Sequence, residues 1–273
     1  MNHSAKAAPA KERIQKLLAQ AGLGSRRSVD KLISQGQVKL NGRTAQPGDQ
    51  AGPGDRLEFN HRRYQVSSRR LTNRTLIYNK PEGRLTTRSD PQGRPTVFEQ
   101  LPRLRGARWI AVGRLDINTS GLLLLTTDGE LAHKMMHPSS QVDREYICRV
   151  RGEVTPEKLA RLRAGVELTD GMAHFSDIKT ASEEPGNKWY YVVLMEGRNR
   201  EVRRLWESQG IQVSRLKRVR YGAVFLPKGL RTGQHREITA SQHRVLREDV
   251  GLPGSVTGLE LKVQGQRRAT GRR

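Results

Sequence analysis

The sequence predicts an α+β protein of two domains. Its 273 residues exceed one average domain. Residues 12–60 show a helix–helix–hairpin pattern, and residues 74–246 show many strand patterns separated by short helices. Residues 1–11 are expected to be a disordered N-terminus, 61–73 a polar, basic linker, and 247–273 a disordered basic tail. A small domain is therefore expected to precede a larger one.

The charge of the chain indicates a polyanionic partner. Fifty Lys and Arg residues against 27 Asp and Glu residues give a formal net charge of +23. Such an excess favours nucleic acid, whose counterions are released on binding, with an anionic membrane surface as the second candidate. No apolar run approaches the roughly 20 residues that span a bilayer, and no signal-peptide core follows Met1. The single cysteine, Cys148, fits a reducing cytoplasm.

The elements of the first domain follow from local patterns. Apolar residues at helical spacing predict a helix that Gly22 ends, and Ser25 is an N-cap candidate for a second helix. The Asn41-Gly42 turn predicts a hairpin, and residues 56–59 predict a closing strand. This stretch resembles an S4 RNA-binding domain. The resemblance implies that residues on the second helix contact RNA, namely Arg26, Arg27 and Lys31. An ordinary solvated helix face is the alternative.

The second domain is expected to begin with a strand at 76–78, followed by the turn 79–83 and a long polar loop. Further on, helices are predicted at 130–137 and 157–163, and strands at 143–150, 174–179 and 189–195. Gly197 is expected to open a turn, and the basic run after it to begin another helix. A helix start with arginines is a natural site for anions.

Residues 113–129 carry the most informative motif, Gly-Arg-Leu-Asp followed by a polar turn and a long apolar run. The motif places one carboxylate, Asp116, on a turn between two apolar segments. Such a fixed carboxylate suits a nucleophile or a general base. The alternative is a turn or helix-cap aspartate.

This motif, the Asn79-Lys80-Pro81 turn and the string 196–205 together resemble the pseudouridine synthases of the small-subunit/large-subunit ribosomal RNA type. The resemblance implies a central, mainly antiparallel mixed sheet and a cofactor-free isomerisation of uridine to pseudouridine. It implies that Asp116 is the catalytic nucleophile, that Arg203 pairs with it, and that Tyr146 stacks on the target base. Taken alone, a tyrosine at this position is more often a half-buried packing residue.

The resemblance also implies a set of RNA contacts and a pocket wall: Lys80, Arg114, Arg198, Arg200, Arg204, Leu216, Lys217 and Arg220. Within the family, the chain resembles the branch that acts on 23S ribosomal RNA. The expected protein is a cytoplasmic monomer that binds ribosomal RNA and needs neither metal nor cofactor. Three alternatives stay open: a non-catalytic S4-type RNA-binding or ribosome-assembly protein, a synthase acting on a 16S or neighbouring 23S uridine, and a non-specific DNA-binding protein.

Overall fold

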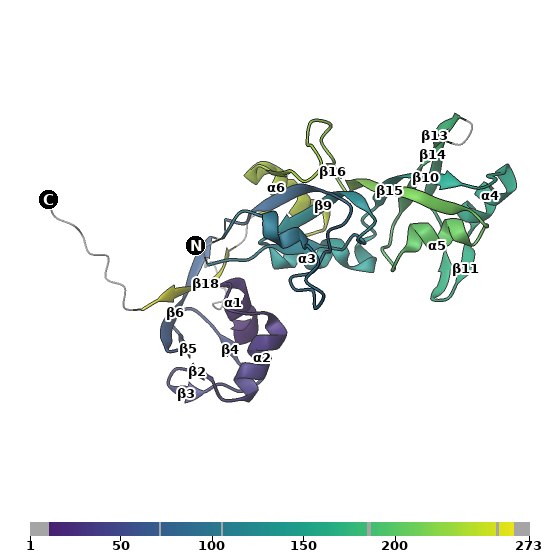
Figure 1. Ribbon diagram of the computed structural model, residues 1–273. Coiled ribbons are helices and arrows are strands. Elements are labelled where there is room, and N and C mark those ends of the chain that lie inside the picture. The colour runs from purple at the N-terminus through teal and green to yellow at the C-terminus, as the bar shows by residue number, and fades with distance from the viewer. Residues whose placement is uncertain (1–10, 71, 105, 185–186, 255–256, 265–273) are drawn as a thin grey trace, which may run out of the picture. The chain divides into compact units, whose positions relative to one another are not determined.

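The computed structural model describes residues 11–70, 72–104, 106–184, 187–254 and 257–264 (Figure 1). These residues form two compact units. The small unit contains the described residues of 1–72, 103–108 and 255–273, and the large unit contains those of 73–102 and 109–254. The middle and the end of the chain therefore both contribute to the small unit. No helix in the described ranges is long and apolar enough to cross a membrane.

The small unit packs two helices against an antiparallel sheet with strand order β18-β6-β5-β2-β3. Ser25 caps the second helix as predicted, because its Oγ accepts a hydrogen bond from the Ser28 backbone at 3.0 Å. The elements are β1 (Glu12–Arg13), α1 (Ile14–Gln20), α2 (Arg26–Ser34), β2 (Val38–Leu40), β3 (Arg43–Thr44), β4 (Gln50–Ala51), β5 (Arg56–Phe59), β6 (Arg62–Arg70) and β18 (Thr257–Val263). The predicted helix–helix–hairpin order is confirmed.

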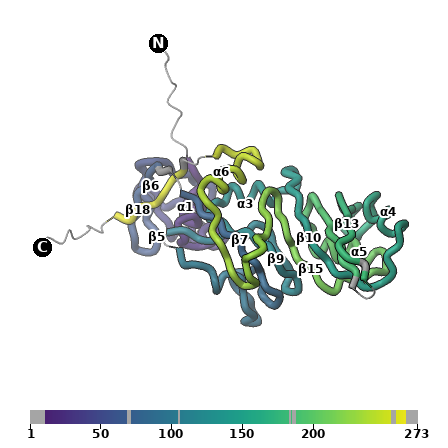
Figure 2. Tube along the Cα trace, turned by 90° about the horizontal axis from the view of Figure 1, so that it is seen from above, coloured from purple at the N-terminus to yellow at the C-terminus, as the bar shows by residue number. Residues whose placement is uncertain are grey.

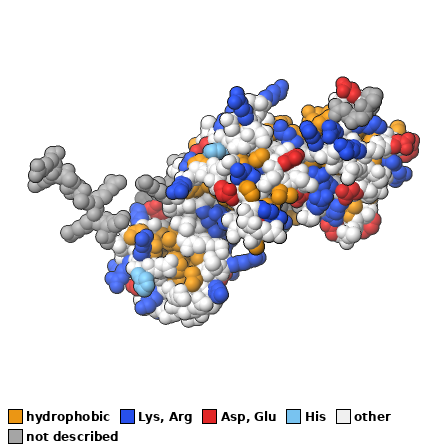
Figure 3. Space-filling view, viewed as in Figure 1, with side chains coloured by type: hydrophobic (Ala, Val, Ile, Leu, Met, Phe, Trp, Pro, Cys, Tyr) orange, Lys and Arg blue, Asp and Glu red, His pale blue; other side chains and the backbone are white. Residues whose placement is uncertain are grey.

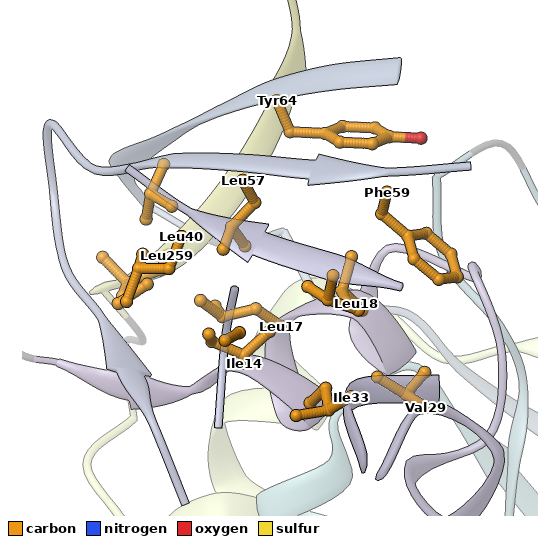
Figure 4. Close-up of a cluster of buried hydrophobic side chains, with 14 residues drawn as sticks. Ile14, Leu17, Leu18, Val29, Ile33, Leu40, Leu57, Phe59, Tyr64 and Leu259 are labelled. Carbon is orange, nitrogen blue, oxygen red and sulfur yellow. The ribbon is translucent and has the colours of Figure 1, made fainter. Parts of the chain in front are cut away.

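The predicted linker and part of the predicted tail are strands of this sheet, so both predictions are wrong for these residues. β6 covers most of 61–73 and pairs antiparallel with β5 and with β18, which Figure 2 traces side by side. The cause is an alternating apolar pattern hidden among basic residues. Tyr64 of β6 and Leu259 of β18 belong to the core of the unit (Figure 4). Val66 of β6 is buried in the same core. Residues 1–10 and 265–273 lie outside the described residues.

The large unit is built on a mixed sheet with strand order β13-β14-β10-β15-β9-β7-β17, with β16 paired to β15 and β8 to β9. Within the described residues, β9 and β15 form its parallel pair and the other pairings are antiparallel, which confirms the predicted mainly antiparallel sheet. The first elements are β7 (Thr75–Lys80), η1 (Val97–Gln100), β8 (Ile110–Val112), β9 (Ser120–Thr126), α3 (Gly129–Met136), η2 (Pro138–Ser140), β10 (Arg144–Arg151) and α4 (Pro156–Ala164).

The remaining elements complete the sheet and its helical cover and add a separate two-stranded sheet, in which residues 166–168 pair with residues 171–173. They are β11 (Val166–Leu168), β12 (Gly171–Ala173), β13 (Asp177–Glu184), β14 (Asn187–Leu194), α5 (Glu201–Glu207), β15 (Gln212–Tyr221), β16 (Val224–Phe225), β17 (His235–Glu237) and α6 (Ala240–Asp249). α6 continues past residue 246, where the sequence predicted the domain to end. Trp206 of α5 anchors the helix to the sheet, with its ring centroid 5.3 Å from that of Tyr190 in β14.

Gly121 fixes how β9 meets β15, and therefore where the Asp116 motif lies. A Cβ atom at this position would fall 2.2 Å from the Arg218 carbonyl oxygen, and the residue has a φ of +97°. Both features require glycine. The close approach allows Ser120 and Gly121 to pair in parallel with Lys217 and Arg218. The start of β9 thus brings the motif to the middle of the sheet.

Candidate active site

A hollow of about 810 Å³ in the large unit collects most of the predicted catalytic residues. Its wall includes the motif residues 113–119, Tyr146 of β10, the turn and helix start at 197–202, and Leu216 and Arg218 of β15. These segments are distant in sequence and meet because β9, β15 and β10 are neighbours in the sheet. The volume is that of a small-molecule or nucleotide site.

The Asp116 carboxylate lies in this wall, partly exposed, and the backbone around it is held from several sides. The Thr119 N–H donates to the Asp116 carbonyl oxygen at 3.1 Å, which closes the turn. The Thr86 hydroxyl donates to the Leu115 carbonyl oxygen at 2.9 Å. The carboxylate itself forms no hydrogen bond or ion pair with another residue in the described ranges. The turn is therefore rigid while its carboxylate stays available to a ligand.

Lys80 is the main support of this turn. It is fully buried, and its Nζ donates to the carbonyl oxygens of Pro81 at 3.0 Å, Asp116 at 2.9 Å and Thr119 at 2.8 Å. Burial lowers the pKa of Lys80 to about 8. The nearby Asp116 carboxylate favours the ammonium form and therefore opposes this shift. All three donors are used internally, so the prediction that Lys80 contacts RNA is wrong.

Arg203 supports the same turn from α5. Its Nη2 donates to the Asn118 carbonyl oxygen at 2.9 Å and its Nη1 to the Val213 carbonyl oxygen at 2.8 Å. Burial lowers the pKa of Arg203, and the charge of Asp116 opposes that shift. Arg203 and Asp116 form no ion pair within 4.0 Å in the described part of the chain. Arg203 is therefore close enough to act electrostatically on Asp116, but the expected direct pair is not formed.

Two further arginines line the pocket, and the sequence did not identify either of them as a pocket residue. Arg144 and Arg218 are 5% and 2% exposed, and each places its guanidinium carbon 4.8 Å from the ring centroid of Tyr221. Arg144 donates to backbone carbonyls and to the Tyr221 hydroxyl, whereas Nη2 of Arg218 has no hydrogen-bond partner among the described residues. The signal that could have identified them is an arginine at an inward-facing position of a strand in which buried and exposed residues alternate.

Tyr146 and Leu216 lie where the sequence placed them. Tyr146 is 8% exposed and lines the hollow, and its neighbour across the β10–β15 pairing is Arg218. Within the described ranges, its hydroxyl forms no hydrogen bond. Leu216 is buried and lines the same hollow. An aromatic ring and an apolar wall beside a carboxylate suit a flat heterocycle.

Several cations predicted to contact RNA are used inside the protein. Arg204 forms a two-point pair with Asp170 at 2.8 and 2.9 Å. Arg198 binds Glu196 and the backbone of 170–172. Arg220 pairs with Asp143 and Glu145. These contacts hold neighbouring segments together, so the three arginines are structural in this arrangement.

The remaining predicted contacts are exposed or partly exposed. Arg114 and Arg200 line the hollow from its exposed side, and Arg200 is 4.0 Å from its nearest anionic partner, Glu207. Lys217 lies on β15, outside the lining of this hollow. In the small unit, the positions predicted on α2 are all exposed: Arg26, Arg27 and Lys31. Figure 3 shows basic side chains gathered over the region where Figure 1 labels β10, β14 and β15.

Glu201 at the start of α5 is a buried acid that sequence reasoning did not single out. It is 3% exposed, lines the hollow, and accepts a hydrogen bond from the Arg198 N–H at 2.9 Å. Burial raises the pKa of Glu201 to about 7, and the neighbouring Glu196 acts in the same direction. Glu201 therefore exchanges protons near neutral pH at the edge of the site.

Two family models match the chain. Residues 74–208 match a model described as RNA pseudouridylate synthase, and residues 12–57 match the S4 domain. A crystal structure of a pseudouridylate synthase aligns with a TM-score of 0.60 and 26% identity, covering 86% of this chain and 99% of that one. The S4 match falls in the small unit, and the synthase match falls in the large unit except for residues 103–108, which belong to the small unit.

Curated relatives extend the similarity over nearly the whole chain, and each is called ribosomal large subunit pseudouridine synthase B. The relative from Pseudomonas aeruginosa is 53% identical over 97% of this chain and 70% of its own length. The one from Escherichia coli O157:H7 is 54% identical over 94% of this chain and 89% of its own. The one from Xylella fastidiosa is 56% identical, but the chain spans only 56% of its length. This chain therefore belongs to the RNA pseudouridylate synthase family, among its members that carry an S4 domain.

Proposed function

We propose that this chain isomerises uridine to pseudouridine in the RNA of the large ribosomal subunit, with Asp116 as the nucleophile and without a cofactor. The observation that carries the proposal is the Asp116 carboxylate, which pairs with no other described residue and lies in the wall of the 810 Å³ hollow, on a turn supported by Lys80 and Arg203. The names of the relatives support the substrate class. The chain itself adds a large positive charge, +23, which suits an RNA substrate.

The reaction breaks the bond between N1 of uracil and C1′ of ribose and forms a bond from C5 to C1′. The base loses its proton at C5 and gains one at N1, so that atoms and electrons balance within one nucleotide. The Asp116 carboxylate attacks C1′, so that an ester bond to C1′ forms as the N1–C1′ bond breaks and uracil leaves as its anion. After the base turns, C5 attacks C1′ and the ester bond breaks, which returns the free carboxylate and divides one difficult step into two easier ones. Its rigid turn keeps the reacting atoms in position.

Tyr146 stacks on the uracil ring in this proposal and assists the loss of the C5 proton. Leu216 forms the opposing apolar wall. The Nη2 of Arg218, which has no hydrogen-bond partner among the described residues, is a donor that a uracil carbonyl oxygen can satisfy. The target nucleotide has to leave its stack to reach these groups, at a cost of a few kcal/mol.

The Asp116→Asn variant tests the proposal. Ribosomal RNA transcripts labelled with tritium at C5 of uridine release the label only when the isomerisation proceeds. The wild-type chain should release it from a 23S transcript, and Asp116→Asn should release none while its RNA affinity stays within about twofold. The exposed Asp249 offers a control, since Asp249→Asn makes the same chemical change away from the hollow.

Two results would contradict the proposal. Tritium release by Asp116→Asn near the wild-type rate would show that another group is the nucleophile. Absence of release by the wild-type chain from both 23S and 16S transcripts and from ribosomal precursor particles, with RNA still bound, would favour the non-catalytic RNA-binding protein. Release from 16S alone would correct the substrate.

A further inference from the structure

The side of the sheet opposite the hollow carries a second feature that the catalytic site does not use. β10 alternates between buried residues facing the hollow and α5, such as Tyr146 and Cys148, and half-exposed residues facing away, such as Ile147 and Arg149. We call the second side the outer face and define it by Ile147, Arg149 and their cross-strand neighbours.

Strand register arranges these neighbours in two rows. Ile147 pairs with Tyr191 of β14 on one side and with Lys217 of β15 on the other. One step along, Arg149 pairs with Trp189 and with Arg215. Side chains at directly paired positions lie about 5 Å apart on the same face. The outer face therefore alternates aromatic, aliphatic and basic side chains across three adjacent strands.

A hollow of about 460 Å³ opens within this face. Its lining includes Trp189 and Ile147 as apolar surfaces and Arg215 and Lys217 as cations, together with the carboxylate residue Glu82. The residues that line this hollow differ from those that line the catalytic hollow, except for Leu216, which contributes to both. It thus combines a stacking surface, positive charge and one hydrogen-bond acceptor.

The cations of the hollow differ from the nearby Arg220, which two carboxylates neutralise. Arg215 is exposed, Lys217 is half-exposed, and neither forms an ion pair in the described ranges. Arg149 donates its Nε to the Ser214 hydroxyl at 3.0 Å and forms no ion pair with a carboxylate of the described residues. The outer face is therefore a site for an anion rather than an internally balanced surface.

We propose that the outer face binds a single-stranded segment of the RNA substrate, with one unstacked base in the hollow against Trp189. Arg215 and Lys217 contact the flanking phosphates, and Glu82 accepts hydrogen bonds from the amino or imino hydrogens of the base. This surface binds the part of the RNA strand that extends beyond the catalytic hollow. The inference rests on the proposed function for the identity of the RNA, but the binding surface is defined by its own residues.

The chemistry favours RNA over an acidic polypeptide as the occupant. An acidic peptide would use the cations but has no flat ring to place against the indole, and Glu82 would repel its carboxylates. A nucleotide uses every group present, because each base offers a stacking face and each phosphate a charge. The sheet geometry, with aromatic and basic residues on adjacent strands, is the one that RNA-stacking sheets use.

Substitutions at Trp189 test the stacking directly. The probe is a single-stranded RNA of mixed sequence, about 12 nucleotides long, and binding is measured with the full chain carrying Asp116→Asn so that no isomerisation intervenes. Trp109 and Trp206 are 5% and 0% exposed, so quenching of tryptophan fluorescence by the RNA should come from Trp189. Trp189→Ala should abolish the quenching and raise Kd about tenfold, while Trp189→Phe should keep Kd within about threefold.

The cations give an independent measurement. Arg215→Ala should weaken RNA binding and reduce the slope of log Kd against log salt by about one. Polyglutamate serves as the acidic polypeptide comparator. Equal RNA affinity of the Trp189→Ala variant and its parent would overturn the proposal, as would polyglutamate binding that depends on Trp189 as strongly as RNA binding does. Failure of the proposed catalytic function would instead appear as absent tritium release with these binding results unchanged.

Discussion

Replacing Lys80 with methionine removes the ammonium group beneath the Asp116 turn and keeps an unbranched, flexible side chain. Three backbone carbonyl oxygens, those of Pro81, Asp116 and Thr119, lose their donor. The site is fully buried, so water does not readily replace the lost hydrogen bonds. We expect the variant to fold with lower stability and with a displaced catalytic carboxylate.

The magnitude follows from two opposing contributions. Hydrogen bonds from a charged donor contribute about 1.5–3 kcal/mol each, so three of them contribute roughly 4–9 kcal/mol. Against this, burial lowers the Lys80 pKa from 10.5 to about 8, a desolvation cost of roughly 3 kcal/mol that methionine does not carry. The difference predicts a net loss of about 3 kcal/mol, with a range of roughly 1–6. In a unit of this size, about 3 kcal/mol lowers Tm by roughly 6–12 °C.

Thermal unfolding, RNA binding and tritium release separate this account from an RNA-contact role. The structural role predicts a lower Tm, a large fall in turnover and an RNA affinity close to that of the wild type. Lys228, which is exposed, provides the matched control, since Lys228→Met should leave Tm and turnover unchanged. A Lys80→Met chain with wild-type Tm but weakened RNA binding would refute the reasoning and restore Lys80 as an RNA contact.

Substitutions at three other residues test the support of the site and of the fold. Arg203→Met should lose turnover and stability together because the Asn118 carbonyl loses its donor, whereas Arg203→Lys should keep part of both; wild-type turnover in the methionine variant would contradict this. The raised pKa of Glu201, about 7 against an ordinary 4.5, means that the folded chain holds a proton that the unfolded chain releases, so stability falls as pH rises through this window. Glu201→Gln should therefore stabilise the chain more at pH 8 than at pH 5, and urea unfolding at both values with an unchanged difference would count against it. Burial raises the pKa of Asp128, but hydrogen bonds from His243, the Leu131 backbone and Arg247 together outweigh burial and lower this pKa to about 2. The carboxylate therefore stabilises the fold above pH 3.8, and this effect is lost as pH falls through 2. Asp128→Asn should cost about 3 kcal/mol at neutral pH and should remove this part of the acid transition, and a variant that keeps the wild-type acid limb would exclude the role.

The sequence by itself determined the elements whose signals are local. The spacing of Ile14 and Leu17, the Ser25 cap and the alternation around Tyr146 each depend on residues within one or two turns of the chain. The motif resemblance located Asp116, Tyr146 and Leu216 in advance, and the structure brings all three to one hollow. Such positions can be predicted from sequence because their neighbours in sequence define their environment.

Tertiary structure decided what the charged residues do. Whether Lys80 faces RNA or three carbonyl oxygens depends on the turn after Asp116, 36 positions away in sequence. The partner of Arg204 is Asp170, and the strand that completes the small unit's sheet comes from beyond residue 256. A lysine or arginine has the same charge in any setting, and only the fold fixes whether its partner is a buried carbonyl, a carboxylate or solvent. For that reason several of the cationic contacts predicted from sequence, such as those of Lys80 and Arg204, were revised by the structure.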